Sequence, residues 1–412
     1  MSTPETEKNT RVWQRYLSMP GNVLALSTVS LLNDTSSEIV YPLLPAFLAL
    51  TLGASPFAIG MIEGFAESIA SILKLFSGYF SDRFGTRKTP VVLGYGLAAL
   101  TRPFLAFATA WQQVLAVRSI DRIGKGIRGA PRDALIADAV SEKDRGLAFG
   151  LNRAADHMGA VLGPSLAFLL LLAFAADTQN PTIAEYQRVF LFASIPVVIG
   201  LFVIFFFVKE EKNGPIRQPE LKLSLAGFDG NFKRFLAIVS LFTLSNSSDA
   251  FLLLRARDAG ISVAMIPLLW GTLHVIKVIS SLIGGGLSDR MGRKALIIAG
   301  WVVYALVYAG FAFVSSPWHC WMLFLVYGVY FGFTEGVEKA FVADMVPANK
   351  RGTAFGLYNL AFGITVLPAS LLFGIAWEWF GATTAFLASA CVSIAAILFL
   401  TTISSEKDAA AS

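Results

Sequence analysis

The sequence predicts an all-α membrane protein whose twelve transmembrane helices form two pseudo-symmetric six-helix bundles. Three observations lead to this fold class. First, 55% of the 412 residues are hydrophobic, only 15% are charged, and the mean hydropathy is +0.63, whereas soluble proteins are about 45–50% apolar and about 25% charged. Second, the apolar residues form twelve stretches of roughly 20 residues, the length that spans a bilayer. Third, sequence motifs recur at half the chain length.

This composition excludes an ordinary water-soluble enzyme, a disordered chain and a nucleic-acid-binding domain. Cys320 and Cys391 lie in apolar runs and are too few for a disulfide framework. Three His and two scattered Cys form no metal-binding cluster, so we expect neither a metal nor a cofactor. The sequence has no Gly-x-x-x-x-Gly-Lys-Ser/Thr loop, which disfavours nucleotide hydrolysis.

The basic residues predict the orientation of the chain. Met1 to Pro20 is polar and has no apolar core, so it is not a signal peptide. Twenty of the 33 Lys and Arg residues lie in the tails and alternate loops and only three in the other loops, so both termini are expected in the cytosol of a bacterial-type inner membrane. The remaining ten lie within spans, which requires a polar interior. The expected spans are 22–50, 55–80, 90–109, 112–138, 147–174, 188–208, 235–255, 263–286, 295–315, 318–343, 353–377 and 383–403.

The second half of the chain repeats motifs of the first half at an offset of 206 or 207 residues. Ser81 to Lys88 matches Ser288 to Lys294, and Arg145 to Leu151 matches Arg351 to Leu357. Because half of 412 is 206, we expect two bundles joined by a charged cytosolic linker. An even number of spans in each half makes the repeats parallel, about an axis along the membrane normal. The expected domains are 1–208, the linker 209–232, and 233–412.

The first two spans carry carboxylates within apolar sequence. Asp34 and Glu38 lie one helical turn apart beside Asn33, and Glu63 and Glu67 share a face of the span 55–80. Desolvation raises the pKa of a carboxyl group and a nearby Arg lowers it, so such a group can gain or lose a proton as its surroundings change. We therefore assign Asp34, Glu38 and Glu67 to proton coupling, with static buried ion pairs as the alternative.

The loop after the second span is expected to act as a gate. Asp82 ends the helix and Arg83 follows it, and the repeat supplies Asp289 and Arg290. A carboxylate that faces a helix N-terminus or an Arg is stabilised, which would latch a closed state. The alternative is that the loop needs its charges for topology alone.

The third and fourth spans carry deeply placed cations. Arg102 is the single charge of the span 90–109, and the charges of the span 112–138 from Arg118 to Asp133 lie in one arc of about 140° on a helix. Isolated charges at the bilayer centre cost about 2.5–3.5 kcal/mol each, so this face must meet water or carboxylates. The candidate substrate contacts here are Arg102, Arg118, Arg122 and Lys125, and Arg122 is also a candidate coupling group.

The fifth span combines small residues with a charged pair. Gly159 and Gly163 are four residues apart, and Pro164 follows them. Small residues allow close helix packing and Pro bends a helix, so we assign these three to the gate, with ordinary packing as the alternative. Arg153 and Asp156 share a face of the same helix and are candidate substrate contacts.

The C-terminal half supplies counterparts to these groups. Asp249 follows two serines, as Glu38 does, and His274 occupies the position of Glu67 in the repeat. Histidine titrates near neutral pH, so Asp249 and His274 are further candidate coupling groups. Lys277 follows His274 by about one turn and is a candidate substrate contact.

Two motifs resemble general signatures of the major facilitator superfamily of secondary transporters, and the resemblance covers the whole chain. The segment from Gly78 to Lys88 resembles the loop between its helices 2 and 3. The segment from Arg122 to Gly126 resembles its helix-4 motif, with Lys125 where Gln is usual.

Two more motifs are similar to those of twelve-span drug/proton antiporters. Gly159 to Pro164 resembles the helix-5 antiporter motif, although Ala167-Phe168 replaces its closing Gly pair. Pro42-Leu43-Leu44-Pro45 is similar to a Pro-x-x-Pro of the first helix in such antiporters.

The resemblance implies a secondary transporter, not an enzyme, that works by alternating access. It implies proton-coupled efflux of drug-like or metabolite molecules, with protons, a small-molecule substrate and the lipid bilayer as partners, no nucleic acid, and a monomeric state. The alternative is proton-coupled uptake or exchange of an organic anion that binds the cationic face of 112–138. Cations that remain unpaired within the protein would favour the anion. An intramembrane enzyme or receptor is the third alternative, but an enzyme would need a nucleophile–base or metal constellation that we do not find.

The charges also predict where the cavity lies. Intramembrane charge is concentrated in the first, second, fourth, fifth, seventh, eighth, tenth and eleventh spans, so these should line a central cavity. A carboxylate of the first span, at a depth similar to that of Arg122, is expected to pair with it in one state and to be protonated in another. Asp34 is slightly favoured over Glu38 because Asn33 and nearby hydroxyl groups hydrate it.

Replacing Asp82 by Asn is expected to slow transport without unfolding the protein. The closed state should lose a charge-assisted contact worth about 1–3 kcal/mol. The measurement is the transport rate at matched expression. Unchanged kinetics would count against a gate at this loop.

Overall fold

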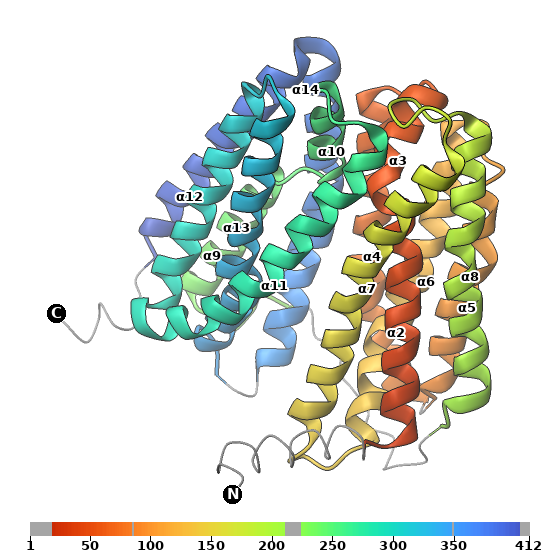
Figure 1. The fold of residues 1–412 in the computed structure, drawn as a ribbon. Coiled ribbons are helices and arrows are strands. Elements are labelled where there is room, and N and C mark those ends of the chain that lie inside the picture. The colour runs from red at the N-terminus through yellow and green to blue at the C-terminus, as the bar shows by residue number, and fades with distance from the viewer. Residues whose placement is uncertain (1–18, 85, 211–223, 348–349, 404–412) are drawn as a thin grey trace, which may run out of the picture.

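The computed structural model describes residues 19–84, 86–210, 224–347 and 350–403, and these residues form helices and connecting turns with no β-strand. Both tails and residues 211–223 of the linker lie outside the described residues, so the predictions for them stay predictions. The helices stand roughly side by side in two groups (Figure 1).

The N-terminal group begins with a helix that changes its winding. Pro42 and Pro45 each lack the backbone N–H that an α-helix uses, and the chain here passes through a 3₁₀ turn and a π-helical turn. Thr182 and Glu185 form a capping box at the start of the last helix of the group. The elements are α2 (Gly21–Val40), η1 (Tyr41–Leu43), α3 (Leu44–Ala46), η2 (Phe47–Thr51), α4 (Pro56–Phe84), α5 (Lys88–Leu105), α6 (Trp111–Asp138), α7 (Arg145–Phe174) and α8 (Ile183–Phe207).

The C-terminal group contains two interruptions. The predicted span 235–255 lies within one candidate membrane segment, Gly230–Asp258, whose helix breaks at residues 246–249 and resumes at Ala250. Gly381, with φ of 84°, interrupts the 51-residue α14 and so separates the two spans predicted there. The elements are α9 (Gly230–Ser245), α10 (Ala250–Asp258), η3 (Val263–Met265), α11 (Ile266–Met291), α12 (Arg293–Ala312), α13 (Pro317–Asp344) and α14 (Arg351–Thr401).

In the described part of the chain, eight helical segments are long and apolar enough to cross a membrane, and one of them is the interrupted α14. The helix α6 is not among them, as its charged face explains. The protein is therefore a multi-pass membrane protein, and the count of twelve spans stays a prediction.

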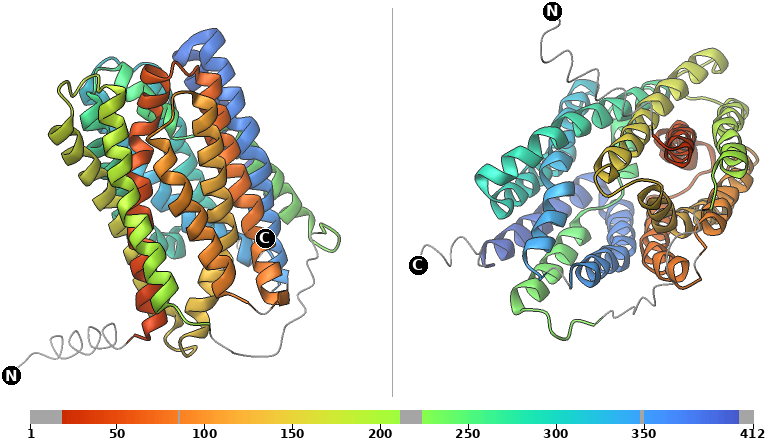
Figure 2. Two further views of the ribbon diagram at one scale, coloured as in Figure 1. Left: turned by 90° about the vertical axis from the view of Figure 1, so that its right-hand side faces the viewer. Right: turned by 90° about the horizontal axis from the view of Figure 1, so that it is seen from below.

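Helix packing follows the two groups. In the first group α2 packs against α7 and α8, and α6 packs against α4 and α5; in the second, α13 packs against α11 and α12, and α14 packs against α9 and α12. The groups meet through α4 against α14 and α7 against α11. The view from below in Figure 2 shows the two groups side by side. The domain boundaries themselves stay a proposal.

The internal repeat reappears as matched contacts. In each half, an Arg in the loop motif contacts a backbone carbonyl and a carboxylate at the end of another helix: Arg87 with Ala134 and Asp138, and Arg293 with Ala340 and Asp344. A second matched pair is Arg145 with the carbonyl oxygen of Ala137 (3.4 Å) and Arg351 with that of Ala343 (3.2 Å). Each contact in the first half has an equivalent 206 residues later in the second half. The repeat is therefore present in the structure as well as in the sequence.

The two ends of the molecule differ. We call the end where the chain passes from α8 to α9 the linker end, and the opposite end the far end. At the far end the halves are joined by hydrogen bonds from the Ala264 N–H to the Thr178 carbonyl oxygen (3.2 Å) and from the Phe57 N–H to Glu378 Oε2 (3.2 Å). The helices converge there and separate toward the linker end (Figure 1).

Glycines allow the closest helix contacts. A Cβ atom on Gly332 of α13 would lie 2.5 Å from the Cβ atom of Ser280 of α11. Its repeat partner, Gly126 of α6, would place a Cβ atom 2.6 Å from that of Leu73 of α4. Both contacts are too short for any side chain, so each half depends on glycine at this crossing.

Replacing Gly332 by Val is expected to destabilise the protein by about 1–3 kcal/mol, because α13 must move away from α11. The matched control is Gly336→Val, one turn further along α13, where nothing lies within 4 Å. The measurement is the temperature at which the purified protein loses its monodisperse elution. Equal loss in both variants would contradict the packing role of Gly332.

Candidate functional site

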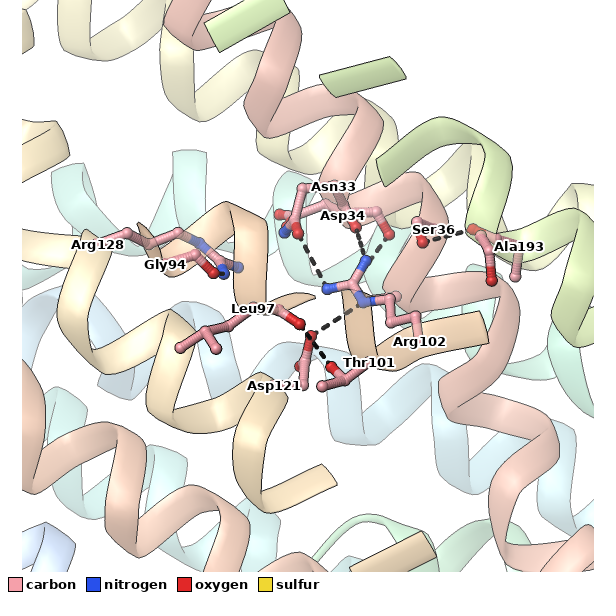
Figure 3. Close-up of polar contacts among 12 residues, drawn as sticks. Asn33, Asp34, Ser36, Gly94, Leu97, Thr101, Arg102, Asp121, Arg128 and Ala193 are labelled. Atoms are coloured by element: carbon pink, nitrogen blue, oxygen red, sulfur yellow. Dashed lines mark hydrogen bonds and ion pairs between the residues drawn. The ribbon is translucent and has the colours of Figure 1, made fainter. Parts of the chain in front are cut away.

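A buried ion pair ties three helices of the N-terminal half together. Arg102 of α5 donates from Nε to Asp121 Oδ1 of α6 (3.0 Å), and its two terminal nitrogens donate to the carbonyl oxygen and to Oδ1 of Asn33 of α2 (2.9 Å each). Figure 3 shows the guanidinium enclosed by these groups. Arg102 and Asp121 are buried. The prediction that Arg102 contacts substrate is not supported by this geometry, because all three of its nitrogens are already engaged.

A second buried pair joins α4 and α6. Arg118 Nη2 lies 2.8 Å from both carboxylate oxygens of Glu63, and the two side chains are only 5% and 8% exposed. The guanidinium also lies 5.7 Å from the ring centre of Tyr41. Arg118 was predicted as a substrate contact, but in this conformation it neutralises Glu63 instead.

The cations further along α6 are less fully paired. Arg122 Nη1 lies 3.9 Å from Glu67 Oε2 of α4, so its ion-pair partner is not the predicted carboxylate of the first span. Lys125 is exposed and forms no hydrogen bond or ion pair with any described residue. The charges of Arg122 and Glu67 act on it, in agreement with its predicted position on the charged face of α6.

The small residues of α7 pack beside the carboxylates of α2. A Cβ atom on Gly159 would lie 2.9 Å from that of Asp34, and one on Gly163 would lie 2.6 Å from that of Glu38. The α7 helix continues through Pro164 without interruption. This geometry supports close packing at these glycines, and their assignment to the gate stays a proposal.

Glu38 reaches across the boundary between the halves. Trp270 of α11 donates from Nε1 to Glu38 Oε2 (2.7 Å), and His274 Nε2 lies 3.8 Å from the same oxygen. The rings of Trp270 and His274 meet edge to face at 4.9 Å. Asp34, by contrast, accepts a hydrogen bond from the neighbouring Asn33 (3.0 Å). The structure thus brings together two of the predicted coupling residues, and adds Trp270, which lies one turn before His274 in the sequence.

Asp249 lies at the helix break between α9 and α10. Tyr327 donates to Asp249 Oδ1 (2.7 Å), and Tyr304 donates to the carbonyl oxygen of Ser245 (2.6 Å). Asn246 donates to the hydroxyl of Tyr330 (3.2 Å). Backbone irregularity inside a membrane persists only where other groups satisfy it, and here Tyr304 satisfies the Ser245 carbonyl while Tyr327 and Tyr330 bind the side chains of the break. The run Asn-Ser-Ser-Asp within an apolar span was the available signal for this break.

The predicted substrate contacts of α7 and α11 meet at a carboxylate of α13. Arg153 Nη2 lies 3.0 Å from Glu335 Oε1, and Lys277 Nζ lies 2.9 Å from Glu335 Oε2. Asp156 lies 3.8 Å from Arg132 of α6. Glu335 therefore links the two halves.

The predicted gate residues make few contacts in this conformation. Arg83 donates to the Tyr79 hydroxyl (3.0 Å), one turn earlier in α4. Asp289 and Arg290 are exposed at the linker end of α11. The side chain of Asp82 lies outside the described residues. The contacts that hold the loop motif are instead those of Arg87 and of its repeat partner Arg293.

An all-helical chain with charge pairs inside its helix bundles and ionisable groups between its two halves has the architecture of a membrane transporter rather than an enzyme. A family model described as the Major Facilitator Superfamily (MFS) matches residues 26–364 and, in a second match, 234–411. The chain belongs to the major facilitator superfamily.

Known proteins agree with this assignment. The chain is 34% identical over 363 residues to an uncharacterised MFS-type transporter of Methanocaldococcus jannaschii. The alignment covers 87% of this chain and 88% of that protein. It is 24% identical over 383 residues to the multidrug resistance protein MdtG of Citrobacter koseri. This alignment covers 89% of this chain and 90% of that protein. Its fold is similar to the crystal structure of a D-xylose-proton symporter, with a TM-score of 0.72 at 18% identity over 94% of this chain and 98% of that chain.

Replacing Arg102 by Met is expected to destabilise the protein by about 3–5 kcal/mol, because Asp121 is left buried and unpaired. The double variant Arg102→Met with Asp121→Leu should recover much of this loss, since it buries no charge. Thermal unfolding of the purified protein measures both effects. Lys125→Met is the control, because Lys125 has no partner to lose among the described residues. No recovery in the double variant would contradict a purely electrostatic role.

Proposed function

We propose that this protein exports a small solute in exchange for protons by alternating access. The observation that carries the proposal is the cluster of Glu38, Trp270 and His274. In it, Trp270 and His274 of the C-terminal half both approach Oε2 of Glu38 in the N-terminal half. Because the partners of Glu38 belong to the opposite half, its surroundings change whenever the halves move. The similarity to a multidrug resistance protein supports export as the direction.

The physical basis of coupling is the cost of an unpaired charge in a dry site. A carboxylate that loses its hydrogen-bond donor inside a membrane is expensive to keep ionised. Movement of the halves and transfer of a proton at Glu38 therefore depend on each other. Glu67 and Asp249 are further candidates, and Asp34 lies one turn from Glu38.

We place the linker end on the cytosolic side, where the basic loops lie. The halves are then joined at the outer side by the hydrogen bonds of the far end, and the helices separate toward the cytosolic side (Figure 1). Lys74, Lys125 and Lys339 are exposed along the polar faces of α4, α6 and α13. A solute would enter from the cytosol past these residues.

A second candidate function is uptake or exchange of an organic anion. The specific observation in its favour is that Lys125 has no partner among the described residues, whereas Arg102 and Arg118 are paired within the protein. An unpaired cation deep in the polar region would attract a carboxylate or phosphate group. Assays of both transport directions in vesicles separate the two functions.

Replacing Glu38 by Gln is expected to abolish transport driven by a pH gradient, because the titratable group is removed while the hydrogen bond from Trp270 can remain. Solute exchange in the absence of a gradient should persist. The measurement is proton flux per transported solute in reconstituted vesicles.

The comparison variant is Asp34→Asn, whose carboxylate contacts a neighbour in its own helix rather than the opposite half. Wild-type pH dependence in Glu38→Gln, together with its loss in Asp34→Asn, would move the coupling site to Asp34. Wild-type behaviour in both would place it among Glu67, Asp249 and His274.

A further inference from the structure

Two cations from opposite halves converge on Glu335. Arg153 belongs to α7 and Lys277 to α11, and they approach different oxygens of the carboxylate at 3.0 and 2.9 Å. The side chain of Arg153 is 56% exposed, and those of Glu335 and Lys277 are 34% and 20% exposed. The three groups therefore meet in a region that water reaches.

This exposure distinguishes the cluster from the buried pairs of the N-terminal half. Arg118 and Glu63 exclude water, so separating them would leave charges uncompensated in a dry site. An exposed ion pair contributes little to stability, because water competes for both partners. The contact between Glu335 and the exposed Arg153 can therefore be exchanged for a contact with another anion at little cost.

The two cations are held in place for binding an anion. Lys277 Nζ lies 4.2 Å from the ring centre of Phe331, a cation–π contact that positions the ammonium group. The guanidinium of an Arg fits a carboxylate or phosphate with two parallel hydrogen bonds, and Lys adds a point charge. Lys339, about one turn after Glu335, is exposed and has no partner among the described residues. The charges of three cations, Arg153, Lys277 and Lys339, therefore act on the Glu335 carboxylate.

We propose that Arg153 and Lys277 form an anion subsite that Glu335 occupies in the empty protein, and that a carboxylate or phosphate group of the transported solute displaces Glu335. The proposal rests on the proposed function only in that the chain carries a small solute, and it holds for export and for uptake. Glu335 competes with the anionic group of the solute for Arg153 and Lys277. A solute therefore needs further contacts elsewhere in the site to bind well.

The test is anion binding to the purified full-length protein in detergent, titrated with succinate and with inorganic phosphate at constant ionic strength. Glu335→Gln removes the competitor and is expected to tighten binding of at least one of these anions by about tenfold, which is about 1.4 kcal/mol. Adding Lys277→Gln to this variant should reverse the gain. Glu142→Gln, at an exposed carboxylate paired with Arg145 in another loop, is the matched control and should bind as the wild type does.

Unchanged binding of both anions in Glu335→Gln, or a gain that persists after Lys277→Gln is added, would overturn the proposal and leave Glu335 as a fixed bridge. Repeating the titration with added phosphatidylglycerol separates a soluble anion from a lipid headgroup. Displacement of the bound anion by the lipid in Glu335→Gln would assign the subsite to lipid phosphate and overturn the role in solute binding. Because no proton gradient is present, failure here leaves proton-coupled transport untouched, and loss of coupling leaves anion binding intact.

Discussion

The pairing of charges inside the N-terminal half is the interaction on which the rest of the structure depends. A helix with as many cations as α6 cannot face lipid, since each unpaired charge is costly there. Carboxylates on α4 and on α6 itself, with polar groups of α2, neutralise Arg118 and Arg102. These contacts fix the rotation of α6 and so decide which of its side chains point toward the boundary between the halves.

Two kinds of ionic contact follow from this arrangement. Within the N-terminal half the Arg118–Glu63 and Arg102–Asp121 pairs are buried and static, and they hold helices together. Between the halves the contacts of Glu38 and Glu335 are more exposed and join residues of opposite halves. The first kind supplies a rigid bundle, and the second kind supplies groups that can exchange partners.

The two halves have the same arrangement of helices, but different side-chain interactions hold each of them together. In the N-terminal half, Arg128 stacks on Tyr95 at 4.2 Å. In the C-terminal half, Trp301, at the repeat position of Tyr95, donates to the buried Glu338 (2.9 Å). Stacked tyrosines, with hydrogen bonds to the broken helix, replace the ionic network there. The ion pairs stabilise one half and aromatic packing stabilises the other.

The sequence by itself determined the helices, the repeat and the existence of a polar interior, because span length, apolar periodicity and matched motifs are local properties. It also identified Glu38, His274, Arg153 and Lys277 as ionisable groups within the membrane. Only the tertiary structure decided which charges meet, because pairing depends on how each helix is rotated and tilted against its neighbours. Arg122 thus faces Glu67 instead of a carboxylate of the first span, and Arg102 turns inward to Asp121. The break at residues 246–249 likewise needed tyrosines from α12 and α13, which no local pattern places beside it.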